Sequence, residues 1–439
     1  MATPSPGFNF IASGVDAWCN FLDFGKANGL RKAKASYFNM PNVTGNFSVT
    51  GLGFKPQAVI VTGATLIGYP EFSGGGRLSV GCATSGAQWA GCLDTGYLEE
   101  VGKRSSHYDN KFVAATTTSG PDYEAEFVSF DADGFTINVT LAPPAPWTIF
   151  FLALAGAGGY ACGTEIARTT PGTQSITGLG FSPTGVYLSS FQKLALGNAF
   201  NAYMSSGAGD RDAINFCIWS GSTHEDAWCS SRYDTGMALT MAIDSSGPGG
   251  FGRAVLAQAY VSSCDTDGFT LTWPFTDGVP RYFSWFAFGG EGQVSRFYST
   301  VGGTIFVPCY TPKALLGFQN SMTMDGWATQ AGTGYPLGAT NSLSVIELAD
   351  NCLSSVAFST SYSDINAPPF SIRDGGRNHT GTAFASRAHD VFDAGNFVAH
   401  DGVVTSCQLL HPWVGLNTRS SSHRRRRMPA KDSTLAPST

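Results

Sequence analysis

Two motifs that each occur twice constrain this 439-residue chain more than any other feature. Residues 130–136 (FDADGFT) return as residues 264–270 (CDTDGFT), and residues 50–56 (TGLGFKP) return as residues 177–183 (TGLGFSP). The two motifs keep their order, and their spacing differs between the copies only by a loop-sized amount. The repeated unit is therefore about 130 residues long, the size of a whole domain rather than of a solenoid repeat or a propeller blade.

The sequence also predicts a third, more divergent copy. A shared cysteine followed by Ser-Gly, at Cys82 and Cys217, adds a landmark to the first two copies. Residues 310–312 (YTP), 343–345 (LSV) and 392–397 (FDAGNF) resemble successive landmarks in the third. We therefore predict an N-terminal arm at 1–39, domains at 40–160, 168–292 and 300–417, and a disordered basic tail at 418–439.

Composition and local pattern favour strands. Charged residues are 13% of the chain and there are 54 glycines, a balance that favours strands and turns over helices. Short apolar runs at residues 57–62, 78–84 and 147–155, with a hairpin at 124–141 whose turn is Asp-Ala-Asp-Gly, indicate antiparallel, jelly-roll-like β-sandwiches. The one stretch with helical character, residues 16–35, is expected to form a docking arm.

The net charge of −6 is unevenly distributed. The last 21 residues, which include the Arg424–Arg427 run, carry +5, so the remaining body carries −11. An acidic body argues against a nucleic-acid surface on the folded part, whereas the tail is either a flexible segment or a contact for an acidic neighbour or nucleic acid. We expect neither a secretory signal nor a membrane span, because the best apolar run, residues 147–157, is far shorter than the roughly 20 residues a span needs.

Motifs that resemble chemical sites fit structural interpretations better. Residues 156–161 (GAGGYA) match a dinucleotide-binding pattern, but no helical period follows them, so we predict a linker. Asp131 and Asp133 begin like a calcium loop that lacks its acidic twelfth position, so we predict a hairpin turn. We expect residues 224–226 (HED) to lie in a solvated loop, and the pair at 389–390 (HD) does not by itself define a catalytic site. We therefore predict no catalytic residue, no cofactor and no metal.

The cysteines leave two alternatives open. Cys82 with Cys92, and Cys217 with Cys229, could each bridge two strands within a copy, or all could stay reduced. The reduced form is favoured by Cys264, which stands where the first copy has Phe130 and would act as a small buried apolar group.

Aromatic residues in the loop-rich middle of the first two copies offer a binding hypothesis. Flat rings on exposed loops could stack against sugar faces, although aromatic side chains in such folds more often pack in the core. The candidate ligand contacts are Trp89, Tyr97, Trp219, Trp228 and Tyr233.

The paired Thr-Gly-Leu-Gly-Phe-x-Pro and Asp-x-Asp-Gly-Phe-Thr landmarks resemble modules of tailed-bacteriophage virion proteins, over residues 40–292 and weakly over 300–417. The resemblance implies a virion location for a protein made in the bacterial cytoplasm. We therefore expect a non-enzymatic, homo-oligomeric structural protein that contacts other virion proteins in the tail, baseplate, fibre or capsid surface. The alternative is a receptor-binding adhesin that recognises a glycan on the host surface.

Overall fold

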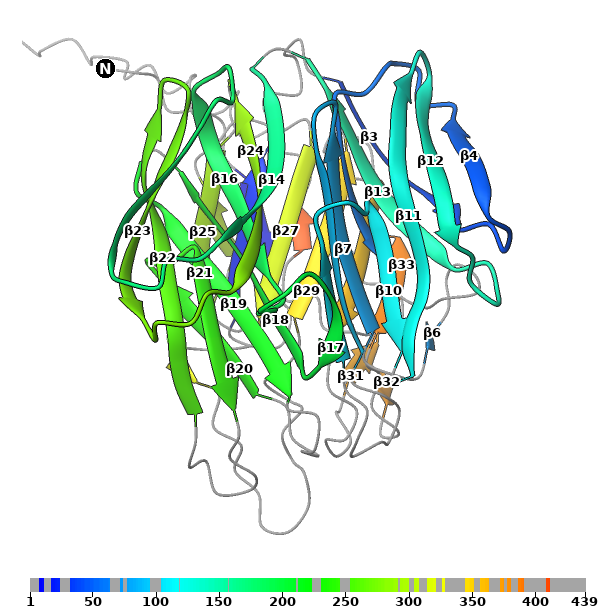
Figure 1. Ribbon diagram of the computed structural model, residues 1–439. Helices are drawn as coiled ribbons and strands as arrows, with labels where there is room; N and C mark the ends of the chain where they lie inside the picture. The colour runs from blue at the N-terminus through cyan, green and yellow to red at the C-terminus, as the bar shows by residue number, and fades with distance from the viewer. Residues whose placement is uncertain are drawn as a thin grey trace, which may run out of the picture.

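The computed structural model shows an all-β protein, as the composition predicts (Figure 1). The strands pair antiparallel, and no helix occurs in the part of the chain that the structure describes. The described residues are 8–11, 17–23, 32–63, 72–73, 77–94, 104–117, 119–156, 158–210, 212–222, 230–244, 253–290, 293–299, 304–307, 314–320, 326–327, 344–350, 356–362, 372–374, 377–379, 386–390 and 408–410.

Residues 32–155 build a first sheet pair. Its large sheet has the order β9-β8-β7-β5-β13-β3, and its small sheet has the order β10-β11-β12-β4. The strands are β3 (Lys32–Asn39), β4 (Gly45–Thr50), β5 (Ala58–Gly63), β7 (Arg77–Thr84), β8 (Gln88–Asp94), β9 (Arg104–Tyr108), β10 (Val113–Thr117), β11 (Gly120–Asp131), β12 (Gly134–Leu141) and β13 (Thr148–Ala155).

Residues 160–289 build a second sheet pair with the same strand order. Its large sheet runs β20-β19-β18-β16-β24-β14 and its small sheet runs β21-β22-β23-β15, so each strand has a counterpart in the first pair. The strands are β14 (Tyr160–Ile166), β15 (Gly172–Thr177), β16 (Pro183–Ser190), β18 (Ala202–Asp210), β19 (Asn215–Ser222), β20 (Ser230–Thr235), β21 (Leu239–Asp244), β22 (Arg253–Asp265), β23 (Gly268–Thr276) and β24 (Tyr282–Gly289).

A third sheet pair combines both ends of the chain. Its large sheet has the order β33-β30-β29-β27-β2-β25, and its small sheet has the order β26-β1-β34. The strands are β1 (Phe8–Ile11), β2 (Ala17–Asp23), β25 (Gln293–Ser299), β26 (Thr304–Val307), β27 (Ala314–Asn320), β29 (Ser344–Asp350), β30 (Val356–Tyr362), β33 (Ser386–Asp390) and β34 (Gln408–Leu410). A separate hairpin joins β31 (Ile372–Asp374) to β32 (Arg377–His379).

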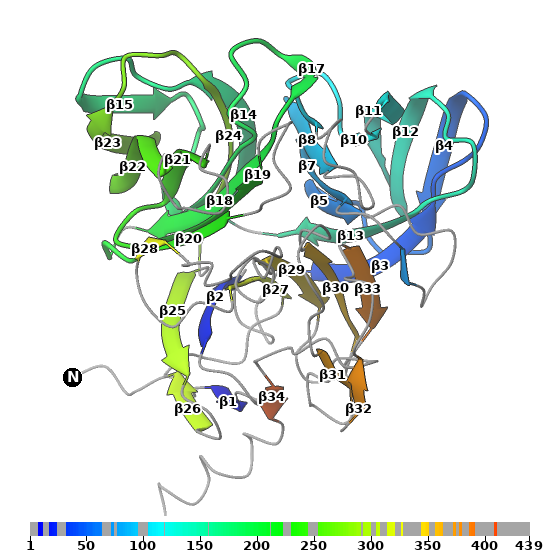
Figure 2. The ribbon, with the colours of Figure 1, turned by 90° about the horizontal axis from the view of Figure 1, so that it is seen from below.

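Each large sheet receives its seventh strand from a different sheet pair. β17 (Gly197–Phe200) of the second pair adds to β9 of the first, β28 (Gly326–Trp327) of the third adds to β20 of the second, and β6 (Phe72–Ser73) of the first adds to β33 of the third. All three donated strands follow the same position in their own pair, after β16, β27 and β5. The exchange therefore runs in one direction around three sheet pairs, which Figure 2 shows arranged around a common centre.

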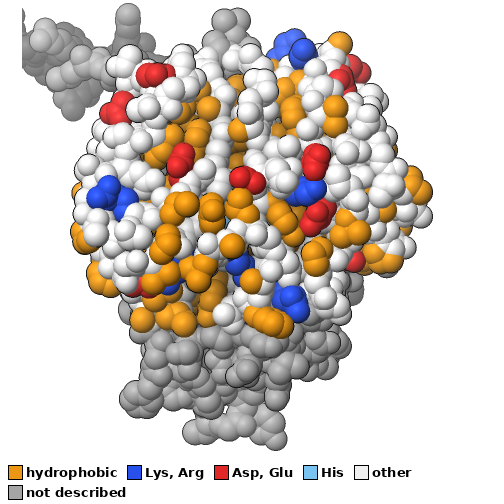
Figure 3. Space-filling view, in the orientation of Figure 1, with side chains coloured by type: hydrophobic (Ala, Val, Ile, Leu, Met, Phe, Trp, Pro, Cys, Tyr) orange, Lys and Arg blue, Asp and Glu red, His pale blue; other side chains and the backbone are white. Residues whose placement is uncertain are grey.

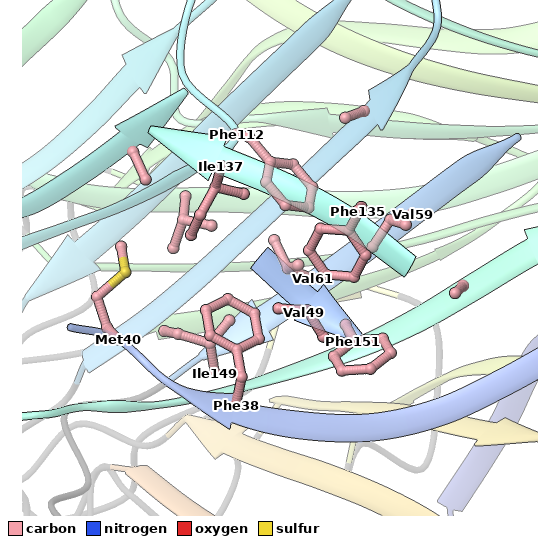
Figure 4. Packing of buried hydrophobic residues seen from close by; sticks show 14 of the residues in the cluster. Phe38, Met40, Val49, Val59, Val61, Phe112, Phe135, Ile137, Ile149 and Phe151 are labelled. Atoms are coloured by element: carbon pink, nitrogen blue, oxygen red, sulfur yellow. The ribbon is translucent and has the colours of Figure 1, made fainter. Parts of the chain in front are cut away.

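A hydrophobic core fills each of the first two sheet pairs. In the first, the ring of Phe135 meets those of Phe38 and Phe151 edge to face, with centroids 5.4 Å apart for Phe135 and Phe151 (Figure 4). In the second, Trp273 and Phe283 meet in the same way at 5.6 Å. Edge-to-face contacts of this kind add stability beyond that from burial of apolar area.

Close approach of the two sheets requires glycine at one repeated position. A Cβ on Gly81 of β7 would lie 2.0 Å from the carbonyl oxygen of Phe112, and one on Gly207 of β18 would lie 2.4 Å from that of Ala238. Both carbonyls belong to the residue just before the first strand of the small sheet. The two sheet pairs therefore share a packing constraint as well as a strand order.

A separate core joins the first large sheet to the second. Trp89, Phe150, Tyr187 and Phe286 are buried there, and the centroids of the Trp89 and Tyr187 rings are 6.1 Å apart. Because each large sheet is covered on both faces, every residue of β13, β16 and β18 is buried. This explains why these strands lack the alternation of a half-exposed strand, and it confirms the buried strand predicted at 147–155.

Several predicted boundaries differ from the structure. The helix predicted at residues 16–35 is wrong, since β2 and β3 lie there and ladder pairing on both edges of β2 overrides any weak helical preference. β3 lies in the segment predicted as the N-terminal arm, and β14 and β25 lie in the segments predicted to link the domains. Each pairs along its length with another strand and forms the edge of its large sheet, at the end opposite the donated strand.

Candidate functional site

The two landmark motifs meet in space and hold one turn against another. The Asp133 carboxylate accepts hydrogen bonds from the backbone N–H groups of Gly51, at 3.1 Å, and Gly53. Asp267 accepts from Gly178, at 3.2 Å, and Gly180 in the second copy. The repeated sequences therefore encode a structural clamp between the β4–β5 and β11–β12 turns and its counterpart in the second sheet pair.

The first aspartate of each turn is also satisfied locally. Asp131 accepts from the hydroxyls of Ser129 and Thr136 at 2.8 and 2.7 Å, and these hydrogen bonds lower the pKa of the carboxyl group. Asp265 accepts from Ser263 and Thr270 in the same way. The hairpin predicted here is confirmed, and no cluster of three potential metal ligands occurs among the described residues.

The most chemically suggestive cluster lies between the first and second large sheets. His107 of β9 is fully buried, and its Nε2 lies 2.6 Å from the Oγ of Ser284 on β24. Ser284 in turn lies 2.8 Å from the Oγ1 of Thr164 on β14. Burial lowers the pKa of His107 to about 3, with a smaller contribution from the charge of Lys193, so the imidazole is neutral at physiological pH.

This serine–histidine pair is suited to a structural role. The Nδ1 of His107 has no hydrogen-bond partner among the described residues. With the proton on Nε2, His107 donates to the Oγ of Ser284, and Nδ1 carries an unused lone pair instead of an unsatisfied N–H. Ser284 can then donate its own proton to Thr164. A nucleophilic serine needs the opposite arrangement, with the histidine accepting its proton, as well as access to substrate. His107 and Ser284 are both 0% exposed.

A buried lysine fixes the strand that crosses from the second sheet pair to the first. The Nζ of Lys193 donates to the carbonyl oxygens of Ala199, Phe200 and Asn201 at 3.0, 3.0 and 3.3 Å. These residues form the end of β17 and its following turn. Burial lowers the pKa of Lys193 to about 7, while three accepting carbonyls favour the charged ammonium.

Side chains on the first sheet pair complete this junction. Arg104 donates to the Oδ1 of Asn198 at 2.9 Å, and its guanidinium lies 4.2 Å from the centroid of the Phe200 ring. Ser105 donates to the carbonyl of Asn201 at 2.7 Å. The crossing strand is therefore held by charge-assisted, aromatic and backbone contacts together.

The predicted aromatic ligand contacts do not form an exposed set. Trp89 and Trp219 are 0% exposed, so the prediction that their rings could stack on a sugar is wrong. Their indole N–H groups donate to the carbonyl of Trp285 and to the Oε1 of Gln192, which completes their role in packing. Tyr233 is on β20, and Tyr97 and Trp228 lie outside the described residues.

The cysteines favour the reduced alternative where the structure describes them. Cys82, Cys92 and Cys217 are buried and not in a disulfide, and the same holds for Cys264, which is half-buried beside the second core. The alignment of Cys82 with Cys217 is wrong, because Cys82 is on β7, whose counterpart in the second pair is β18, whereas Cys217 is on β19, the counterpart of β8. Cys229 lies outside the described residues.

The remaining motifs contribute little to a chemical site. The GAGGYA segment leads directly from β13 into β14, so it connects strands instead of opening a helix. Residues 224–226, 392–397 and 418–439 lie outside the described residues, and His389 and Asp390 end β33. On the face drawn in Figure 3, charged side chains are scattered among apolar and neutral ones.

Sequence reasoning missed the His107–Ser284–Thr164 chain and the Lys193 clamp. The members of the His107–Ser284–Thr164 chain are far apart in sequence, and only the packing of the two large sheets brings them together. Lys193 lies only six to eight residues before the carbonyls that it binds, but backbone acceptors leave no sequence motif. No membrane-spanning helix is found among the residues that the structure describes. Comparisons of the chain with models of known protein families, with curated proteins and with solved structures found no match.

Proposed function

We propose that this chain is a non-enzymatic structural protein of a tailed-bacteriophage virion, which acts through its contact surfaces. The observation that carries the proposal is the use made of its reactive side chains. His107, Ser284 and Lys193 are buried at the junction of two sheet pairs and are engaged in holding that junction together. The buried polar groups of the chain therefore stabilise a rigid scaffold.

The proposed scaffold consists of three divergent copies of one β-sandwich around a pseudo-threefold centre. Two observations support this interpretation. The three large sheets have equivalent strand orders, and the donated edge strands β17, β28 and β6 pass in one direction around the three sheet pairs. The contacts between large sheets follow the same cycle, since β14 lies on β7 and β8, β25 on β18 and β19, and β3 on β29 and β30.

Such a scaffold would present similar surfaces at several places on one chain. The small sheets show alternating burial in β4, β12, β15 and β23, as expected for sheets with one solvated face. We propose that these outer faces contact other virion proteins or further copies of the chain, on the tail, baseplate, fibre or capsid surface. The resemblance of the landmark turns to phage modules motivates the choice of a virion.

Purified virions from the bacterium that produces the protein provide the test. Quantitative mass spectrometry should find the chain in a fixed, integral copy number per particle, and electron microscopy with a labelled antibody should place it at one repeated position. Light scattering of the purified protein would give its oligomeric state. A chain that is absent from washed particles, or that is present only in trace amounts, would contradict the virion proposal.

A further inference from the structure

The third sheet pair is completed by strands from the beginning of the chain. β2 lies between β25 and β27, the position that β13 and β24 occupy in the first two large sheets. β1 lies between β26 and β34, the position that β12 and β23 occupy in the first two small sheets. In both earlier pairs, these positions belong to the last two strands of the copy.

The sequence of the N-terminal segment agrees with this placement. β1 begins at Phe8, which follows a glycine in the sequence, and β12 and β23 begin with the same Gly-Phe pair, at residues 134–135 and 268–269. An aromatic or aliphatic strand then leads to a glycine, at Gly25 after β2, as it does at Gly156 and Gly289. Residues 7–25 thus have both the position and the sequence pattern of the end of a copy.

We infer that residues 7–25 supply the last two strands of the third copy, carried at the opposite end of the chain, and that β1 and β2 bind there as a two-strand clasp, one strand in each sheet. The inference goes beyond the proposed function because it assigns a binding site, with two components. One is the slot between β25 and β27, and the other is the slot between β26 and β34. The ligand is this clasp of two extended strands, each recognised mainly through backbone hydrogen bonds.

The slots need an occupant because both walls of each would otherwise be open sheet edges. All seven residues of β2 pair with β25, and six of them pair with β27. Without β2, the facing N–H and C=O groups of both neighbours would lose their ladder partners, and the large sheet would be split in two. No other described strand lies in that position.

The geometry favours the clasp of the same chain as the occupant. Eight residues, 24–31, connect β2 to β3, and a link of this length spans at most about 30 Å. β3 itself contacts β29 and β30 of the third large sheet. The connection is therefore anchored beside the slot that β2 fills, and the clasp closes a ring of three sheet pairs within one chain.

Hydrogen exchange of the full-length chain, followed by mass spectrometry, tests the clasp. In the unsubstituted protein, amides of residues 17–23 should exchange at least about 100-fold more slowly than in an unstructured peptide. Asn20→Pro removes an N–H in a strand paired on both edges. It should accelerate exchange in β2, β25 and β27, and leave β5 and β16 unchanged. Asn20→Thr, which keeps the N–H and suits a strand, is the matched control.

Each result decides the inference. Exchange of residues 17–23 at the unstructured rate in the unsubstituted protein would overturn it, even if Asn20→Pro failed to fold. An Asn20→Pro protein that folds with β25 and β27 fully protected would also overturn it. Protection that disappears on dilution, together with a doubled mass in light scattering, would show that the two strands bind a second copy, which would overturn the intramolecular clasp.

Discussion

Replacing Trp89 with alanine tests whether the first two sheet pairs share a core. Trp89 is fully buried on the face of β8 that meets the second large sheet, and its indole N–H donates to the carbonyl of Trp285 at 3.0 Å. Truncating a buried aromatic residue typically costs about 3–5 kcal/mol, of which the lost hydrogen bond supplies about 1. We expect Trp89→Ala to destabilise the protein by about 3–5 kcal/mol.

The location of the damage is more informative than its size. Because Trp89 touches both large sheets, Trp89→Ala should accelerate hydrogen exchange in β7 and β8 of the first pair and in β16 and β24 of the second. Trp89→Phe, which keeps a ring in place, should cost only about 1–2 kcal/mol. Trp273→Ala is the matched control, since Trp273 is equally buried but packs within the second pair and bonds to Gln174 there.

Denaturant titration gives the loss of stability, and exchange resolved by peptide shows where it falls. If Trp89→Ala accelerates exchange in the first sheet pair alone, the two pairs behave as independent domains and the shared core contributes little. If Trp273→Ala affects both pairs as strongly as Trp89→Ala does, the comparison cannot assign the effect to the junction, and the argument from the shared core fails.

Three further predictions address the clamp, the buried imidazole and the buried lysine. Asp133→Ala should lower the free energy of unfolding by about 1–3 kcal/mol and speed exchange at Gly51 and Gly53, and an unchanged calorimetric melting temperature would contradict the clamp. His107 binds a proton only below about pH 3 when folded but near pH 6.5 when unfolded. Stability should therefore fall as pH drops through that window, by up to about 1.4 kcal/mol per pH unit, in urea titrations. His107→Gln should remove that dependence, and an identical slope in the variant would refute the assignment. Lys193→Met should accelerate exchange in β9 and β17 while β7 stays protected, and unchanged protection of β17 would show that the lysine is dispensable.

The sequence predicted the repeated turns well because their determinants are local. An aspartate that begins the turn and a glycine at its end specify the hairpin, and Asp133 and Asp267 also bond to the other repeated motif. The buried strand predicted at residues 147–155 was recognisable because an unbroken apolar run needs cover on both faces. What lies on the second face, however, is another copy of the fold, which no local pattern reveals.

The errors have related physical causes. Residues 17–23 have no turn signal that would mark them as a strand. Their partner strands begin at Gln293 and Ala314, so no local stretch of sequence contains both members of either pair. The false match of Cys82 with Cys217 arose because short Ser-Gly sequences recur by chance in a chain with 54 glycines. His107 looked ordinary because its partner, Ser284, is on a strand of the other copy.

The pairing of β2 with β25 also delays the folding of the N-terminal strands during biosynthesis. About 270 residues separate the two strands in sequence, so at roughly 5–20 residues per second the ribosome delivers the partner on the order of 15–60 s later. By then the first sheet pair, complete at Ala155, can already have collapsed. The two N-terminal strands must meanwhile remain free of other sheet edges, because unpaired strands promote aggregation. A chaperone that shields nascent N-termini should therefore matter more for the yield of this protein than for that of a chain whose strands pair in order.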